Sequence, residues 1–334
     1  MKRSVGGVNF YMEENNKLKI LFAGNGSICL EVFKAVVENF NCVGLLTGVD
    51  KKGARGNKRI TPEIKLIAEE KGIPVIQVDH LRTDERKRVT SLEPDFLLSF
   101  SFGRIFGLKF LSLFNKGTLN VHPSLLPDSR GPSPLRSAIL SGRDEWGISF
   151  QEIGLKMDEG RLFGSFPFPL EGNETVESLT EKVSSLAVEP CIQILKKIER
   201  GEAKLEQQLG EASYCYLVKK EDGALDFNNT VSKVHSLIRA NYPWPKAYSF
   251  FGGKKVFITG VKGNFNSGNV EFNTSSYKCG EIVEYNKNKG VGVMCSDGII
   301  YLTGFQFPTK KEISHRDFMN RFQSGVGQLF CLEQ

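Results

Sequence analysis

The sequence predicts an α/β domain with a Rossmann-like, mostly parallel sheet, followed by a smaller, OB-like β-barrel. Three observations lead to this expectation. Between Lys17 and about Gly201, short apolar runs alternate with amphipathic stretches, which is the pattern of βαβ units. Beyond this region, short β runs are punctuated by Gly and Asn, as in small barrels. The chain of 334 residues is also long enough for two domains that each bury a core.

The first domain is expected to alternate strands with helices. Apolar runs predict its strands at 18–23, 42–47, 74–77, 96–100 and 118–121. Helical patterns lie between them near 27–38, 62–72 and 83–91. After a β-like region at 148–168, Thr175 can cap one long helix that runs to about Arg200, with apolar residues on one face.

The second domain is expected to hold one helix near 231–240 and several β runs, at 246–261, 279–285, 290–296 and 299–306. Because the stretch Glu199–Glu211 is charged, it is interpreted as the connection between domains. The predicted boundaries are an N-terminal extension at 1–17, the α/β domain at 18–201, a linker at 202–213 and the barrel at 214–330.

Charge is biased toward the second domain. From residue 207 onward the chain carries 15 Lys and Arg against 11 Asp and Glu, so most of the formal net charge of +6 lies in the last third. Such a bias suits a polyanionic partner, and it equally suits a surface that keeps the protein soluble.

The cysteines and the apolar runs indicate in which cellular compartment the protein is expected. The seven cysteines are odd in number and scattered, with no C-x-x-C pair, which favours neither a disulfide framework nor a zinc site. No apolar run reaches membrane-spanning length, and the polar opening Met1–Lys17 lacks the apolar core of a signal peptide. We therefore expect a cytoplasmic protein with no membrane anchor and no metal site.

The candidate chemistry begins with Asn120 and His122, at the end of a predicted strand. Because they are two residues apart, their side chains point to the same face, at the carboxyl edge where open α/β sheets bind ligands. Pro123 and Pro127 stiffen the loop that follows, and Ser124–Leu126 offer backbone hydrogen-bonding groups that a planar heterocycle could use. An amide, an imidazole and a carboxylate suffice to move an acyl group onto an amine. The alternative interpretation is a histidine that merely ends a strand.

Asp158 is the candidate carboxylate. It lies in Lys156–Gly160, flanked by apolar, β-like residues, where a carboxylate needs a hydrogen-bonding partner. On its own, Asp158 is better interpreted as a turn residue ahead of Gly160. Its functional interpretation therefore depends on its being brought beside His122.

Two glycine-containing segments follow the early strands. The segment Gly24–Cys29 suggests a dinucleotide-binding turn, but Cys29 replaces the third glycine, and the acidic residue expected after the second strand appears only as Asp50 in a loop. This disfavours a nicotinamide cofactor. The segment Lys51–Arg59 holds five cations and two glycines, which indicates either a solvated loop or phosphate contacts to a nucleic acid.

Taken together, these motifs identify a family resemblance along nearly the whole chain. The motifs are Phe22–Gly24, Asp50–Lys58, Ala68–Val75, Asn120–Pro127, Arg130–Pro134, Asp158-x-Gly160, Tyr216, Lys220–Gly223 and Ile238–Tyr248. The chain resembles the methionyl-tRNA formyltransferases of the folate-dependent formyltransferase family. Asn-x-His and Asp-x-Gly are shared by all folate-dependent formyl transfer enzymes, and the Arg-x-x-x-Pro-Trp-Pro stretch before a small barrel narrows the match to the tRNA enzyme.

The resemblance implies roles for particular residues. The catalytic residues would be Asn120, His122 and Asp158. The formyl donor would be 10-formyltetrahydrofolate, with the folate lying against Ser124, Leu125, Leu126 and Pro127. The acceptor would be the α-amine of methionine esterified to initiator tRNA, and no metal would be needed. We expect a monomer.

The resemblance also implies tRNA contacts. In the family, the loop that matches Lys51–Arg59 inserts at the acceptor end of the tRNA. The expected contacts are Arg55 first, then Lys58, with Lys51 and Lys52 beside them. The barrel would hold the acceptor arm through sequence-tolerant phosphate contacts.

Departures from the family pattern leave alternatives open. This chain has Gly26 and Ile28 where the family usually has Pro and Phe, and Gly154 and Arg161 where the family has acids near the catalytic Asp. The alternatives are hydrolysis of 10-formyltetrahydrofolate, formyl transfer to an amino sugar, and a tRNA-binding paralogue that has lost catalysis. Pro243–Pro245 argues against the hydrolase, which carries a different appended domain, and an amino-sugar enzyme would not require a basic barrel.

Overall fold

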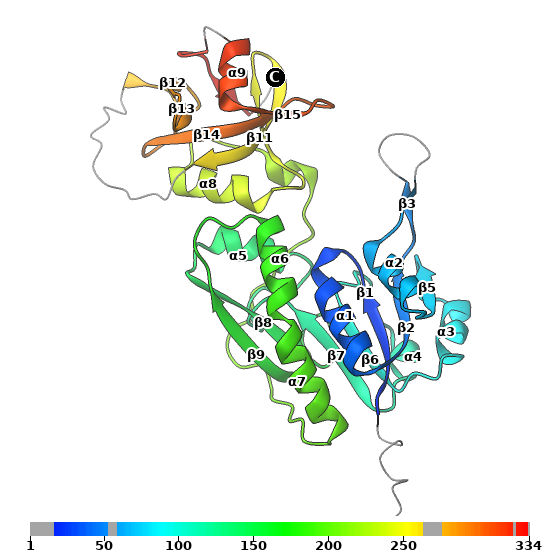
Figure 1. The fold of residues 1–334 in the computed structure, drawn as a ribbon. Coiled ribbons are helices and arrows are strands. Elements are labelled where there is room, and N and C mark those ends of the chain that lie inside the picture. The colour runs from blue at the N-terminus through cyan, green and yellow to red at the C-terminus, as the bar shows by residue number, and fades with distance from the viewer. Residues whose placement is uncertain (1–16, 53–58, 263–275, 323–324, 333–334) are drawn as a thin grey trace, which may run out of the picture. The chain divides into compact units, whose positions relative to one another are not determined.

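The computed structural model describes residues 17–52, 59–262, 276–322 and 325–332 (Figure 1). The chain divides into two compact units that interleave along the sequence. The first unit comprises 1–127, 148–166 and 181–211, and the second comprises 128–147, 167–180 and 212–334. The boundaries predicted from the sequence, with a linker at 202–213, stay a prediction.

The first large sheet has the strand order β5-β2-β1-β6-β7-β8-β9. Strands β5, β2, β1, β6 and β7 run parallel to their neighbours, and β8 pairs with β7 in the antiparallel sense. The prediction of a mostly parallel sheet in an α/β unit is therefore confirmed. The strands are β1 (Lys19–Gly24), β2 (Asn41–Gly48), β5 (Val75–Val78), β6 (Phe96–Phe100), β7 (Gly117–His122), β8 (Glu145–Gln151) and β9 (Leu162–Pro169).

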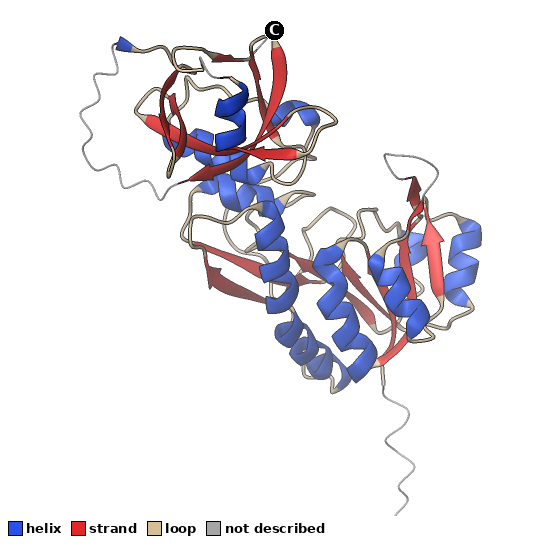
Figure 2. Ribbon diagram, turned by 45° about the horizontal axis from the view of Figure 1, so that its top comes forward, coloured by secondary structure: helices blue, strands red, loops and turns tan. Residues whose placement is uncertain are grey.

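Helices accompany this sheet, as Figure 2 shows. α1 packs against α7, and the ring of Phe33 in α1 meets that of Phe22 in β1 edge-on, with centroids 5.0 Å apart. The short α4 and α5 were not predicted. The helices of the first unit are α1 (Leu30–Asn39), preceded by the 3-10 turn Ser27–Cys29, then α2 (Glu63–Glu70), α3 (Thr83–Thr90), α4 (Leu108–Leu111) and α7 (Val188–Glu199). Helix α5 (Pro134–Ser141) belongs to the second unit, and α6 (Val176–Leu186) spans residues of both.

The single long helix predicted to follow Thr175 is wrong. The structure has two helices, because α6 ends at Leu186 and α7 begins at Val188. Pro190 supplies the physical reason: it has no backbone N–H to donate to the carbonyl of Leu186, and its ring would clash with that carbonyl in a continuous helix. None of the helices in the described ranges is long and apolar enough to cross a bilayer.

The last part of the chain forms an antiparallel sheet in the order β12-β13-β14-β11-β10-β16, with β15 beside β14. It closes on itself, because Phe330 N donates to Gly280 O at 2.8 Å and Ile282 N donates to Gln328 O at 2.9 Å. The predicted barrel is confirmed. Its strands are β10 (Ala247–Phe251), β11 (Lys254–Lys262), β12 (Ile282–Asn286), β13 (Gly290–Met294), β14 (Ile299–Gln306), β15 (Glu312–Ser314) and β16 (Phe330–Cys331).

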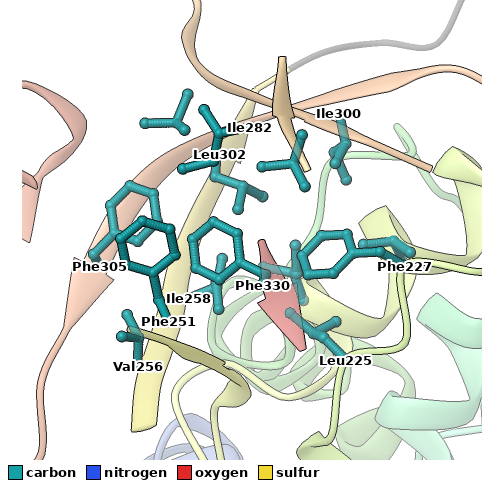
Figure 3. Close-up of a cluster of buried hydrophobic side chains, with 14 of the residues drawn as sticks. Leu225, Phe227, Phe251, Val256, Ile258, Ile282, Ile300, Leu302, Phe305 and Phe330 are labelled. Atoms are coloured by element: carbon teal, nitrogen blue, oxygen red, sulfur yellow. The ribbon is translucent and has the colours of Figure 1, made fainter. Parts of the chain in front are cut away.

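Aromatic rings fill the barrel (Figure 3). Phe305 stacks on Phe318 with ring centroids 4.1 Å apart, and Phe251 lies 4.8 Å from Phe330. Phe318 comes from α9 (His315–Arg321), a helix that was not predicted, while α8 (Val231–Ala240) confirms the predicted helix. Such buried rings contribute most of the apolar area of a small core, so the barrel can be stable around them.

Candidate active site

Strand β7 carries Asn120 and His122 to the carboxyl edge of the parallel strands. Its antiparallel neighbour β8 sets Gln151 opposite Asn120 and Ser149 opposite His122. Directly opposed residues of a sheet project from the same face, so these four polar side chains share one face. His122 is buried, with 5% of its surface exposed, whereas Asn120 is half-buried.

Asp158 lies beside this face, in the loop between β8 and β9. Its Oδ1 is 3.6 Å from His122 Nδ1, and it accepts a hydrogen bond of 2.8 Å from Gln151 Nε2. The side chain of Asp158 is 12% exposed. The structure therefore brings together the imidazole and the carboxylate on which the functional interpretation of Asp158 depends.

The Asp-x-Gly spacing follows from the shape of this loop. Asp158 has a φ of 55°, in the left-handed region, which Asp tolerates better than most residues. At Gly160, a β-carbon would lie 1.7 Å from the carbonyl oxygen of Glu152, which only glycine avoids. Glu152 N donates to Arg161 O at 2.8 Å and closes the base of the loop.

The loop Ser124–Pro127, predicted to face a folate, is anchored by Ser149. Ser149 Oγ donates to Ser124 O at 2.8 Å and accepts from Leu126 N at 3.0 Å. Ser124 and Leu126 are buried, whereas Leu125 and Pro127 are half-buried. One hydroxyl on β8 thus fixes the chain direction immediately after His122.

The departures near Asp158 occupy the outside of the loop. Arg161 pairs with the Glu152 carboxylate at 3.0 Å, and both side chains are exposed. A β-carbon at Gly154 would meet no atom closer than 3.9 Å, so glycine is not required there by a close approach. Neither Gly154 nor Arg161 therefore disturbs the approach of Asp158 to His122.

The predicted tRNA contacts are described only in part. Arg55 and Lys58 lie outside the described residues. Lys51 and Lys52 form β3, which pairs in the antiparallel sense with β4 (Arg59–Ile60). The prediction that this segment contacts nucleic acid stays a prediction.

A cavity that was not predicted from the sequence lies after the carboxyl ends of β5 and β6. Its volume is about 440 Å³. Basic side chains (His80, Arg86, Lys109) and apolar ones (Leu81, Ile105, Leu108, Phe110) line it together. The exposure of Ile105, at 73%, is a signal of an unfilled apolar surface that only the structure reveals.

In the second unit, the Ile238–Tyr248 motif separates into buried and exposed parts. Arg239 Nη1 donates to Glu174 O at 2.8 Å, and the buried Asn241 accepts from Arg136 of α5 at 3.3 Å. These two residues therefore hold α8 in place. Trp244 is 57% exposed, which leaves it available to a partner.

The environment of His235 indicates that the stability of the second unit depends on pH. Arg239 Nε donates to His235 Nδ1 at 3.2 Å, and burial, followed by the charge of Arg239, lowers the pKa of His235 from 6.5 to about 4. Because the folded state disfavours the protonated ring, neutral His235 contributes to the free energy of unfolding. This contribution is complete above pH 6.5 and is lost as the pH falls toward about 4. The loss is at most about 3 kcal/mol.

We therefore expect the urea midpoint of the wild type to fall between pH 6.5 and about 4 more steeply than that of His235→Gln. Glutamine keeps an acceptor for Arg239 but cannot be protonated. Equal slopes for the two proteins would contradict this assignment.

Among the residues that the structure describes, no three of His, Cys, Asp and Glu gather to hold a metal ion. None of the seven cysteines, all of which lie in the described ranges, forms a disulfide.

Comparison with protein families and relatives gives consistent results. Residues 17–195 match the family model "Formyl transferase", and residues 217–323 match "Formyl transferase, C-terminal domain". A curated protein of Borreliella afzelii named methionyl-tRNA formyltransferase is 35% identical over 322 residues, covering 94% of this chain and 98% of that protein.

Solved structures share the fold at lower identity. Methionyl-tRNA formyltransferase from Clostridium thermocellum has a TM-score of 0.53 and 18% identity, covering 75% of this chain and 95% of that chain. HypX from Aquifex aeolicus, solved with tetrahydrofolic acid, has a TM-score of 0.62 and 20% identity, covering 93% of this chain and 48% of the longer HypX chain.

Proposed function

The chain belongs to the formyl transferase family, and within it to the methionyl-tRNA formyltransferases. We propose that it transfers a formyl group to methionyl-tRNA with the side chains of Asn120, His122 and Asp158. The formyl donor is 10-formyltetrahydrofolate. The acceptor is the free amino group of methionine on initiator tRNA, and the product is N-formylmethionyl-tRNA for the initiation of translation.

Each of the three side chains has a defined part in this reaction. The amine attacks the formyl carbon, and negative charge develops on the formyl oxygen. The tetrahedral intermediate then collapses: the bond from the formyl carbon to N10 breaks, N10 takes up a proton and tetrahydrofolate leaves. The Asn120 amide and the protonated His122 ring donate hydrogen bonds to that oxygen. Asp158 orients the ring, favours its charged form and helps to take the proton that the amine loses.

The observation that carries this proposal is the placement of Asp158 Oδ1 3.6 Å from His122 Nδ1, on the face that Asn120 shares. A carboxylate next to a buried imidazole would be costly to retain without a purpose, because both groups lose hydration. The amide on the same face completes the set that formyl transfer requires.

The cavity after β5 and β6 supports a folate donor. Tetrahydrofolate ends in a p-aminobenzoyl group that carries glutamate carboxylates. Ile105 and Leu108 can cover the aromatic ring, while Arg86, Lys109 and His80 suit the carboxylates. The loop Ser124–Pro127 is proposed to lie against the remainder of the folate.

Single-turnover formylation of charged initiator tRNA, with enzyme in excess, tests the proposal. The expected product is N-formylmethionyl-tRNA, formed only when 10-formyltetrahydrofolate is present. Formate release without product would instead favour the hydrolase, and tRNA binding without any turnover would favour the catalytically impaired paralogue. The exposed ion pair of Arg161 with Glu152, at the base of the loop, leaves the approach of Asp158 to His122 in place, which weighs against that paralogue.

The basic segment provides a separate prediction. Arg55→Ala should raise the KM for charged tRNA about fivefold and weaken its salt dependence, because one phosphate contact is lost. The KM for the folate should stay constant. Lys197→Ala, which removes an exposed cation of α7, is the matched control. An unaltered dependence on tRNA concentration for Arg55→Ala would count against the contact.

The proposal includes a cytoplasmic setting and a single chain as the active unit. Seven cysteines that form no disulfide in the described structure are compatible with a reducing compartment. The three catalytic side chains all come from one chain, so no second copy is needed to complete them.

A further inference from the structure

We propose that Gln151 and Gln208 are positioning residues that hold Asp158 against His122. The inference rests on the proposed function, because it assumes that Asp158 acts in catalysis. Both glutamines contact the Asp158 loop directly, one through the carboxylate and the other through backbone carbonyls.

Gln151 holds the carboxylate from β8. Its Nε2 donates to Asp158 Oδ1 at 2.8 Å, and this is the same oxygen that lies 3.6 Å from His122 Nδ1. A carboxylate oxygen only accepts hydrogen bonds, so this contact fixes which end of the amide faces Asp158. Gln151 thus donates to the same carboxylate oxygen that lies nearest to the His122 ring.

The other end of the Gln151 amide shows that this placement has a cost. Within the part of the chain that the structure describes, Gln151 Oε1 is buried and has no hydrogen-bond partner. It faces Gly160, 3.5 Å from where a β-carbon would stand. An unpaired buried carbonyl costs about 1–3 kcal/mol. Stability alone would favour an apolar residue, which indicates that the donor is retained for Asp158.

Gln208 holds the backbone of the same loop. Its Nε2 donates to Asp158 O at 2.9 Å and to Gly160 O at 2.8 Å, so one amide bridges both ends of the Asp-x-Gly turn. Asp158 has a left-handed φ of 55°, a conformation that needs support from its surroundings. Gln208 supplies that support from a segment predicted to be a linker.

The segment that bears Gln208 is itself anchored. Leu162 and Glu206 exchange two backbone hydrogen bonds, of 2.7 Å and 2.9 Å, which dock the segment beside the start of β9. Residues 206–208 are therefore built into the support of the catalytic loop. A loss of either glutamine should let Asp158 move away from the imidazole, and a displacement of about 1 Å can cost up to 100-fold in rate.

Gln151→Leu and Gln208→Leu test this inference, with Gln207→Leu as the matched control because Gln207 is exposed and adjacent. The full-length enzyme is assayed with charged initiator tRNA and 10-formyltetrahydrofolate. We expect each of the two variants to lower kcat about 10- to 100-fold, with KM for both substrates within twofold of wild type. The control should match the wild type.

The ring signals of His122 in the NMR spectrum give a readout independent of activity. They should shift in both variants and stay unchanged in the control, because only the variants displace the neighbouring carboxylate. A kcat within twofold of wild type, or a kcat loss without a change in the His122 signals, would overturn the inference. If the wild type makes no formylmethionyl-tRNA, the proposed function fails, while the His122 signals still test the positioning.

Discussion

His122→Ala is expected to lower the rate of formyl transfer by about 10³-fold while the affinity for tRNA stays nearly unchanged. In the proposed mechanism the ring donates a hydrogen bond to the developing negative charge, and it lies 3.6 Å from Asp158 Oδ1, so its removal would take away both contributions at once. Because His122 is only 5% exposed, it offers little surface to a macromolecular partner. Single-turnover rates and tRNA binding, measured on the same preparation, separate the two effects.

His315→Ala is the matched control for this substitution. His315 lies at the start of α9 in the second unit, where its Nε2 contacts Lys287 O at 3.2 Å. Its removal should leave the transfer rate within twofold of wild type. A wild-type-like rate for His122→Ala would remove His122 from the reaction.

Gly160→Ala is expected to lower kcat about 100-fold and to destabilise the first unit. The added β-carbon would lie 1.7 Å from Glu152 O, so the loop must shift and carry Asp158 with it. Neither the length of the loop nor its charges change in this variant. The measurement is kcat together with the thermal unfolding midpoint.

The same loop offers a control for this second substitution. Gly154→Ala adds a β-carbon with no neighbour closer than 3.9 Å, so both the rate and the midpoint should stay close to wild type. Equal effects of the two alanines would mean that loop flexibility, rather than the close approach of Glu152, explains the requirement for glycine.

Elements with strong local patterns could be predicted from the sequence. The apolar runs placed the strands of the parallel sheet, and two-residue spacing put Asn120 and His122 on one face, because side chains alternate along a strand. The break between α6 and α7 could not be predicted from apolar periodicity, because that periodicity continues past Pro190. The short helices α4 and α9 were missed because so few residues carry no clear period.

The sequence by itself determined the fold class and supplied the chemical groups, since these depend on local periodicity and residue identity. Only the tertiary structure decided that Asp158 meets His122, because that contact depends on how β7 pairs with β8 and on how the next loop folds back. The same holds for Gln208, which lies 50 residues beyond Asp158 in the chain and reaches its carbonyl through the docking of Glu206 beside Leu162. Contacts of this kind join distant segments, and no local pattern in the chain encodes them.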